Sequence, residues 1–229
     1  MNLKSLKKAF PYTIPVLLGY LFLGSAFGIL LSSKGYGPLW ALIMSVTMYA
    51  GSGQFVAIGF LTSPFDLINA FVVTLMVNLR HLFYGLSLLE RFKAAGKKRF
   101  YMMFSLTDET YSLLCGIKAP KEVDKHQFYC SIGFLDHIYW IISCVLGNII
   151  GSTIPFNAKG IDFVMTALFM VIFLDQWKDS KTHIPQFVGI GISVLCLLLI
   201  GAENFLLPAM SLILICSGIL KRRLEAKLA

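Results

Sequence analysis

Apolar runs follow one another along the whole chain. They cover Tyr12–Ser33, Leu39–Thr62, Phe65–Leu89, Met102–Ile117, Phe128–Ile154, Ile161–Trp177, Ile184–Gly201 and Leu206–Leu220. A helix needs about 20 mostly apolar residues to cross a bilayer. The connections between the runs are short and contain no linker for a second domain. The pattern therefore predicts one all-α polytopic membrane domain over residues 1–229.

The composition supports this prediction, because 57% of the 229 residues are hydrophobic and only 14% are charged. Soluble domains carry about 25% charged residues, and the mean hydropathy here is +0.74. The net charge of +8 is concentrated near the N-terminus, at 91–99 and at 221–227. These positions flank apolar runs, and basic residues beside membrane spans gather in cytoplasmic loops. The charge therefore indicates membrane orientation and not a nucleic-acid partner.

Basic residues at both ends predict that both termini are cytoplasmic, which requires an even number of crossings. Eight ordinary spans satisfy that condition, but they place the basic loop 91–99 outside. The loop returns to the cytoplasm if run 39–62 enters the membrane, turns at Gly51–Gly53 and leaves on the same side. Run 102–117, short and polar at its centre, is then broken too. We favour about six full transmembrane helices plus two broken or re-entrant elements, with eight spans as the alternative.

The first predicted break has the sequence Gly51-Ser52-Gly53-Gln54. Glycine permits backbone angles that other residues avoid. If Phe55–Thr62 begins a new half-helix, the N–H groups of residues 52–55 form its N-terminus, which attracts anions such as a carboxylate. A glycine-rich kink that only bends a helix is the alternative interpretation.

Run 65–89 carries Asn78, Arg80 and His81 near its centre. A charge at mid-membrane depth costs roughly 2.5–3.5 kcal/mol on insertion scales, so such residues face protein or water and are usually functional. A purely structural arginine, satisfied by backbone carbonyls at a break, is the alternative. Arg80 and Asn78 are about 200° apart on a helix and should point to nearly opposite faces.

Two further groups of titratable residues interrupt apolar runs. Of the adjacent acids Asp108 and Glu109, one could hold a substrate ammonium or relay a proton, and the other could pair with Arg80. Solvated acids in a cytoplasmic hairpin are the alternative. Asp136 and His137 lie within run 128–154, and a histidine beside an acid can titrate near neutral pH. They are candidates for proton coupling or for a purely structural pair.

Motifs of membrane enzymes and of ATP-driven proteins are not found in the sequence. It contains neither HExxH nor GxSxG, the four histidines lack the spacing of metal ligands, and GxxxxGK[ST] is missing. We therefore expect no metal, no cofactor and no enzymatic activity, with an ion gradient or a separate protein as the energy source. The two GxxxG patterns, Gly24/Gly28 and Gly147/Gly151, predict close helix packing.

Four segments in order resemble the AzlC family, the large subunits of bacterial branched-chain amino acid exporters. They are "FVAIGFL" after the break, "NLRHLFYGLSL", "LTDETYSLL" and "LDHIYWIISCVLGNIIG". The resemblance covers nearly the whole chain. Three polar groups stand where that family's recurring polar residues fall: Gln54, Asn78-Leu79-Arg80-His81 and Asp108-Glu109.

The resemblance implies secondary export of leucine, isoleucine and valine across the bacterial inner membrane, together with a small AzlD-type membrane subunit. A zwitterion with an apolar side chain needs an anion clamp, a cation partner and an apolar pocket. Gly51–Gln54 with Arg80 fit the clamp, and Asp108 or Glu109 fits the cation partner. A channel, a transporter for another small solute and a non-transporting structural subunit remain the alternatives.

Overall fold

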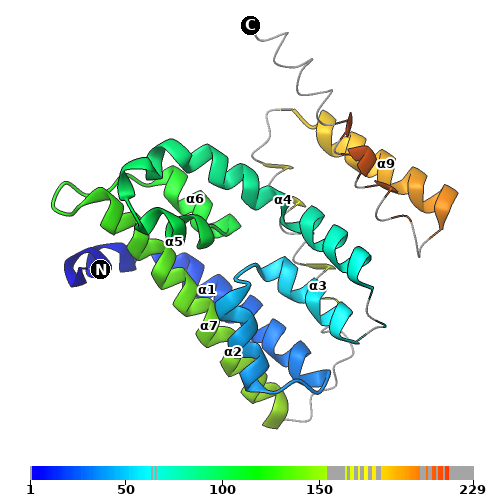
Figure 1. Cartoon of the computed structure of the whole chain (residues 1–229), viewed down its shortest axis with the longest axis horizontal. Helices are drawn as coiled ribbons and strands as arrows, with labels where there is room; N and C mark the ends of the chain where they lie inside the picture. The colour runs from blue at the N-terminus through cyan, green and yellow to red at the C-terminus, as the bar shows by residue number, and fades with distance from the viewer. Residues whose placement is uncertain are drawn as a thin grey trace, which may run out of the picture. The chain divides into compact units, whose positions relative to one another are not determined.

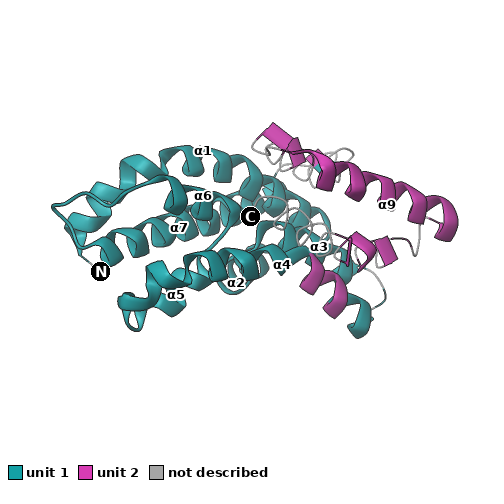
Figure 2. Cartoon of the chain, turned by 90° about the horizontal axis from the view of Figure 1, so that it is seen from above, with its two compact units in different colours: residues 1–70, 77–166 teal, residues 71–76, 167–229 magenta. Residues whose placement is uncertain are grey.

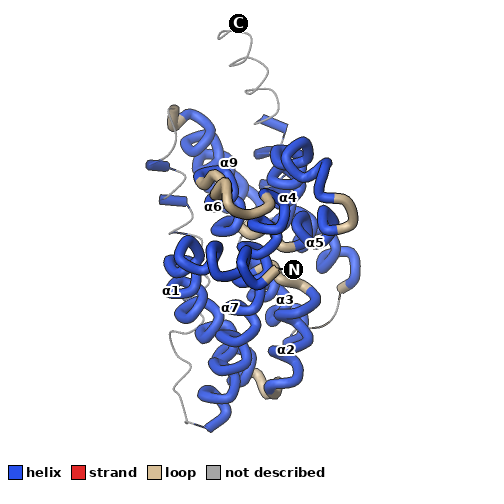
Figure 3. The backbone as a smooth tube through the Cα atoms, turned by 90° about the vertical axis from the view of Figure 1, so that its left-hand side faces the viewer, coloured by secondary structure: helices blue, strands red, loops and turns tan. Residues whose placement is uncertain are grey.

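The computed structural model describes most of the chain, and all regular structure in the described residues is helical (Figure 3). Described are residues 2–62, 64, 66–153, 163, 166, 167, 170, 173, 174, 177, 178, 182–201, 205, 208, 209, 211–213, 215 and 216. The elements, labelled in Figure 1, are α1 (Leu3–Ser33), α2 (Pro38–Thr47), α3 (Gly51–Thr62), α4 (Leu67–Phe92), η1 (Lys93–Ala95), α5 (Lys98–Phe104), α6 (Asp108–Gly116), α7 (Lys125–Thr153) and α9 (Ile184–Ile200). The all-α prediction is confirmed for these residues.

Three helices in the described part are long and apolar enough to cross a membrane: Leu3–Ser33, Leu67–Ala95 and Lys125–Thr153. The predicted runs 39–62 and 102–117 are each split into two short helices, as the broken-element interpretation expects. The predicted runs 161–177 and 206–220 lie largely outside the described residues. The basic cluster 221–227 lies outside them entirely.

The chain divides into two compact units (Figure 2). Unit 1 contains Met1–Ala70 and Val77–Thr166, and unit 2 contains Phe71–Met76 and Ala167–Ala229. In unit 2, Trp177 stacks on His183 with ring centroids 4.3 Å apart, just before α9 begins. Every sequence-predicted site residue belongs to unit 1, so its internal arrangement decides the site.

Helices α1 and α7 pack along each other more extensively than any other pair (Figure 1). The Thr13 and Tyr139 hydroxyls are 3.1 Å apart, and the Asn148 amide donates to the Gly28 carbonyl over 3.1 Å. From the first contact to the second, the residue number increases in both helices, so the two helices are parallel. Both predicted GxxxG patterns lie in this contact, where Gly28 and Gly147 each meet backbone of the other helix. The prediction of close packing is confirmed.

Helices α2 and α3 form a hairpin. The Tyr36 hydroxyl, just before α2, donates to the Leu61 carbonyl near the end of α3 over 2.9 Å, so the chain returns to the end at which it entered. The turn differs from the predicted one, because the residue with positive φ is Tyr49 (φ 35°) and neither Gly51 nor Gly53. The two glycines instead provide room, since a Cβ on Gly51 would lie 3.3 Å from Trp140 and one on Gly53 3.0 Å from Asn78.

The beginning of α1, the end of α4 and the beginning of α7 lie together. Ala9, Phe92 and Phe128 belong to one buried apolar cluster, so α4 runs antiparallel to α1. Arg91 ties this end to α7, donating to the Tyr129 hydroxyl over 2.9 Å with its guanidinium 4.6 Å from the centre of the Tyr129 ring.

The loop between α6 and α7 lies at the same end. Lys8 in α1 forms an ion pair with Glu122 in this loop, at 2.8 Å. The hydrogen bond and charge of Lys8 lower the pKa of the exposed Glu122 carboxyl. The N-terminal segment, the basic loop after α4 and the loop 117–124 therefore share one end of unit 1.

Replacing Gly28 by alanine should destabilise the fold, because the new Cβ would overlap the Cys144 carbonyl and the Asn148 N–H in α7. Overpacking of this kind costs typically 1–3 kcal/mol. Gly19→Ala, in the same helix, is the matched control, since nothing lies within 4 Å of the Cβ it adds. Thermal unfolding of the purified variants in detergent should show a lower midpoint for Gly28→Ala only. Equal midpoints for the two variants would contradict the α1–α7 packing.

Candidate functional site

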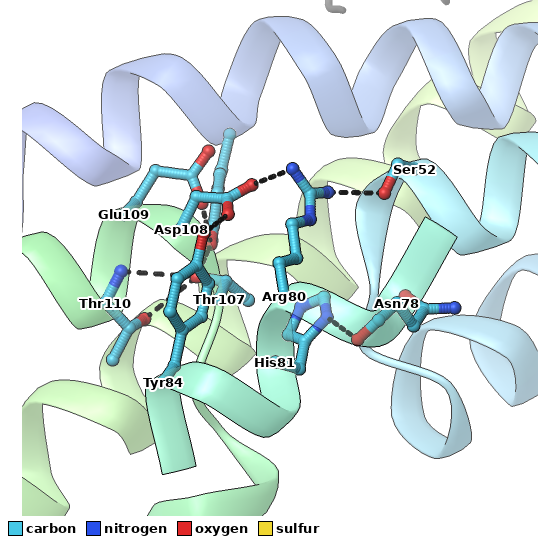
Figure 4. A network of polar contacts seen from close by, with 10 residues as sticks. Ser52, Asn78, Arg80, His81, Tyr84, Thr107, Asp108, Glu109 and Thr110 are labelled. Atoms are coloured by element: carbon cyan, nitrogen blue, oxygen red, sulfur yellow. Dashed lines mark hydrogen bonds and ion pairs between the residues drawn. The ribbon is translucent and has the colours of Figure 1, made fainter. Parts of the chain in front are cut away.

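The two helix breaks meet halfway along the long helices. Tyr49 in the first break stacks on His137 of α7, with ring centroids 4.3 Å apart. Thr107 in the second break lies 2.6 Å from the hydroxyl of Tyr20 in α1. α2 and α3 reach this level from one end of unit 1, and α5 and α6 reach it from the other. The first turns of α3 and α6 therefore both begin at the centre, beside α4 (Figure 4).

Arg80 of α4 connects both breaks. Its Nη1 forms an ion pair with Asp108 Oδ2 at 2.8 Å, and its Nη2 donates to Ser52 Oγ over 2.5 Å (Figure 4). The Tyr84 hydroxyl donates to the other carboxylate oxygen of Asp108, also over 2.5 Å. The structure thus confirms that one of the two adjacent acids pairs with Arg80. The ion pair is 22% and 27% exposed, and Arg80 Nε is buried without a partner.

The start of α3 is displaced from the predicted one. This helix begins at Gly51 and not at Phe55, and the Gln54 N–H already donates to the Ala50 carbonyl over 2.8 Å. The prediction that the N–H groups of residues 52–55 are free is therefore wrong for Gln54. The Gln54 side chain is fully buried and accepts from Trp140 Nε1 over 2.6 Å, while its own Nε2 has no partner.

Asn78 and Arg80 both reach the first turn of α3. Asn78 lies against Gly53, and Arg80 bonds to Ser52. Two side chains predicted to point to nearly opposite faces therefore contact the same neighbouring helix, and that prediction is wrong. The His81 ring stays close to its own helix, with Nδ1 3.2 Å from the Asn78 carbonyl.

Helix α6 begins with a side-chain cap that fixes both acids. The Thr107 hydroxyl accepts from the Thr110 N–H over 3.2 Å, as an N-cap does. Asp108 and Glu109 occupy the first turn, where the helix dipole favours negative charge. Glu109 turns toward α1, where its carboxylate is 3.0 Å from the Tyr20 hydroxyl. The two acids thus have separate partners.

Asp136 and His137 also face different partners. Asp136 is fully buried and accepts from the Thr110 hydroxyl over 2.8 Å. The His137 ring lies 3.1 Å from the Tyr101 hydroxyl through Nδ1 and 3.2 Å from the Ser45 carbonyl through Nε2. A neutral imidazole satisfies both contacts, with the proton on Nε2. The two residues therefore do not form the pair that their adjacency suggested.

Five hydroxyl-bearing residues of the network were not among the predicted site residues: Tyr20, Tyr49, Tyr84, Thr107 and Thr110. Tyrosine and threonine are common in apolar runs and carry no charge that would single them out. Thr110 lies three residues after Thr107. Because an N-cap threonine accepts from the N–H three residues later, this spacing was the available signal for Thr110. Within the described residues, no three acidic, histidine or cysteine side chains gather as metal ligands do.

A comparison with known families shows which family the chain belongs to. The profile of the AzlC family, described as AzlC protein, matches residues 15–154. The chain belongs to the AzlC family. All the site residues described above in this AzlC-family chain lie within the matched part.

Relatives of this AzlC-family chain are found in several bacteria. It is 45% identical to the branched-chain amino acid transport protein AzlC of Bacillus subtilis, over 96% of this chain and 86% of the relative. It is 45% identical to an uncharacterized membrane protein of Helicobacter pylori, over 97% and 98%, and 25% identical to the inner membrane protein YgaZ of Escherichia coli, over 93% and 88%. No solved structure matches the chain.

The Arg80–Asp108 contact should appear as an energetic coupling. Breaking a buried ion pair from one side costs about 3–5 kcal/mol, because it leaves a charge uncompensated, and partial exposure should reduce that cost here. We expect Arg80→Ala and Asp108→Ala each to lower the unfolding midpoint, and the double variant to lower it by less than their sum. Thermal unfolding of the four proteins in detergent measures this coupling. Strictly additive shifts would mean that the two side chains do not interact.

Proposed function

We propose that this chain is a secondary transporter of branched-chain amino acids and that it moves them outward across the bacterial inner membrane. The observation that carries the proposal is the Arg80–Asp108 pair, held between two helix breaks in the middle of unit 1. The family membership and the name of the Bacillus subtilis relative, a branched-chain amino acid transport protein, support transport of amino acids.

An amino acid zwitterion is complementary to such a pair. Its carboxylate can approach the guanidinium of Arg80 and the first turn of α3 around Ser52, while its ammonium approaches Asp108. The site and the ligand are each neutral overall, so binding moves no net charge out of water. Arginine suits this role because its planar guanidinium forms two parallel hydrogen bonds with a carboxylate, and Nε is still unpartnered here.

Apolar side chains border the same break and would accept the hydrocarbon part of the substrate. Phe55 is buried in the second turn of α3 and meets Phe27 with ring centroids 5.6 Å apart. Trp140 is buried beside Gly51 and meets Tyr20 at 5.0 Å.

The end of unit 1 that gathers the N-terminal segment and the loop after α4 would face the cytoplasm. Its basic residues favour that side, and the antiparallel course of α4 supports a topology in which α2/α3 and α5/α6 enter from opposite sides without crossing. Broken backbone is tolerated at membrane depth where protein covers it. In export, the substrate would then enter the site from this cytoplasmic end, and an ion gradient would drive its transport.

A cysteine introduced at Lys97 should be protected in intact cells and should react with an impermeant thiol reagent in inverted vesicles. The background lacks the five native cysteines. Lys34→Cys, in the turn between α1 and α2 at the opposite end, is the matched control and should show the reverse pattern. Labelling of Lys97→Cys from outside would restore eight ordinary spans.

We also propose a small AzlD-type membrane subunit as partner, on the strength of the family. Exposed apolar side chains on α9, such as Leu195, Leu198 and Leu199, offer a surface that either lipid or a partner helix can cover. Transport at full rate by the purified chain alone in liposomes would exclude the partner.

Arg80→Lys should abolish most leucine transport while leaving the protein folded. Lysine keeps a positive charge near Asp108 but offers a point charge in place of the two-pronged guanidinium contact. Efflux of labelled leucine from dipeptide-loaded cells, normalised to the amount of protein in the membrane, measures the effect. If the surviving Arg80→Lys protein transports leucine with unchanged affinity, Arg80 only supports the fold.

A further inference from the structure

A continuous row of oxygen atoms connects Glu109 and Asp136, two acids that form no ion pair with Arg80. Glu109 Oε2 lies 3.0 Å from the Tyr20 hydroxyl, which lies 2.6 Å from the Thr107 hydroxyl. The Thr107 hydroxyl is 3.1 Å from that of Thr110, which is 2.8 Å from Asp136 Oδ2. The row crosses from α6 to α1, returns to α6 and ends on α7. Figure 4 shows its three α6 members, Thr107, Glu109 and Thr110, around one helix turn.

This row has one contact more than it has hydroxyl protons. Its four contacts need four protons if each one is a hydrogen bond, and the three hydroxyl groups supply three. The fourth proton must come from a carboxyl group, either Glu109 or Asp136. If it sits on Glu109, every hydroxyl donates toward Asp136; if it sits on Asp136, every hydroxyl donates toward Glu109. Burial favours the same outcome, because a carboxyl group in a low dielectric prefers its neutral form.

We propose that Glu109 and Asp136 share one proton and exchange it through Tyr20, Thr107 and Thr110, and that this exchange couples transport to the proton gradient. This inference rests on the proposed function, which calls for an ion gradient. It replaces the sequence-based candidate pair Asp136–His137 by Asp136–Glu109, since His137 has other partners for both ring nitrogens.

The transfer conserves protons and leaves no charged hydroxyl. Glu109 gives its proton to Tyr20 as Tyr20 gives its own to Thr107, Thr107 to Thr110, and Thr110 to Asp136. Four O–H bonds break and four form. One proton has moved from Glu109 to Asp136, and one negative charge has moved the opposite way.

Both ends of the row are suited to such an exchange. Glu109 is half-buried and adjacent to Asp108, so a substrate ammonium at Asp108 would favour the ionised form of Glu109 and drive the proton toward Asp136. At the other end, Asp136 Oδ1 and the Tyr49 hydroxyl are buried without hydrogen-bond partners. The titratable groups around Asp136, on all the elements packed against it, are Tyr20, Tyr49, Tyr101, Glu109, His137 and Tyr139.

Thr110→Val removes the relay without removing either acid, and Thr110→Ser is the matched control that keeps a hydroxyl. Each purified protein, with its small subunit if transport requires it, is placed in liposomes that contain a pH-sensitive dye. Two rates are measured: exchange of labelled for unlabelled leucine, and proton movement per leucine during net transport. For Thr110→Val we expect near-normal exchange and the loss of most proton movement per leucine, because valine has no O–H group to pass the proton on.

Thr110→Ser should keep the wild-type ratio of protons to leucine. A wild-type ratio in Thr110→Val would overturn the proposal. If Thr110→Val does not fold, Tyr20→Phe interrupts the row at another point and is judged by the same two rates.

Failure of the proposed function is distinguishable from failure of the proton relay. If the wild-type protein moves no leucine, the transport proposal fails, and the shared proton is then tested by infrared spectroscopy at neutral pH. Subtracting the spectrum of the Glu109→Gln/Asp136→Asn variant from that of wild type should leave the C=O band of a single protonated carboxyl group. A difference spectrum without that band would overturn the relay.

Discussion

The arrangement of unit 1 depends on keeping a guanidinium paired in the middle of an apolar helix bundle. Arg80 lies halfway along α4, where leaving its charge unmatched would be costly. Asp108 can reach it only because run 102–117 is broken at 105–107, and Ser52 only because run 39–62 is broken at 48–50. The ion pair therefore accounts for why both apolar runs stop halfway and begin new helices at the same depth.

The parallel contact of α1 and α7 holds the other side of this centre. Because glycines let the two backbones approach closely, Tyr20 and Trp140 come into contact beside the first turn of α3. Gln54, Thr107 and Glu109 then find their partners on these helices. The close packing of the glycines between α1 and α7 thus determines which polar side chains contact one another at the two helix breaks.

Local patterns in the sequence predicted much of this arrangement. The GxxxG patterns predicted a close helix contact, the charge at 91–99 predicted two broken elements, and the adjacent acids predicted a partner for Arg80. These predictions needed only the order of the apolar runs and the positions of the charged residues and glycines along the chain, so they did not require knowledge of the fold.

Contacts between distant segments could not be predicted in this way. Tyr20 and Glu109 are 89 positions apart, and nothing near either residue indicates the other. The turn at Tyr49 was missed because glycine is the usual residue at positive φ, whereas here the neighbouring glycines serve packing. The direction of Arg80 was missed because helix geometry places a Cβ but not the end of a long side chain.

The central claim is that the Arg80–Asp108 pair binds both charged groups of an amino acid. Equilibrium binding to the purified protein tests it with three ligands of similar shape: leucine, leucine amide, which lacks the carboxylate, and 4-methylpentanoate, which lacks the ammonium. Each missing group removes a charge-assisted contact worth roughly 1.5–3 kcal/mol, so both analogues should bind about ten- to a hundredfold more weakly than leucine. Equal affinity for all three ligands would show that the protein recognises only the apolar side chain, and would contradict this account of the site.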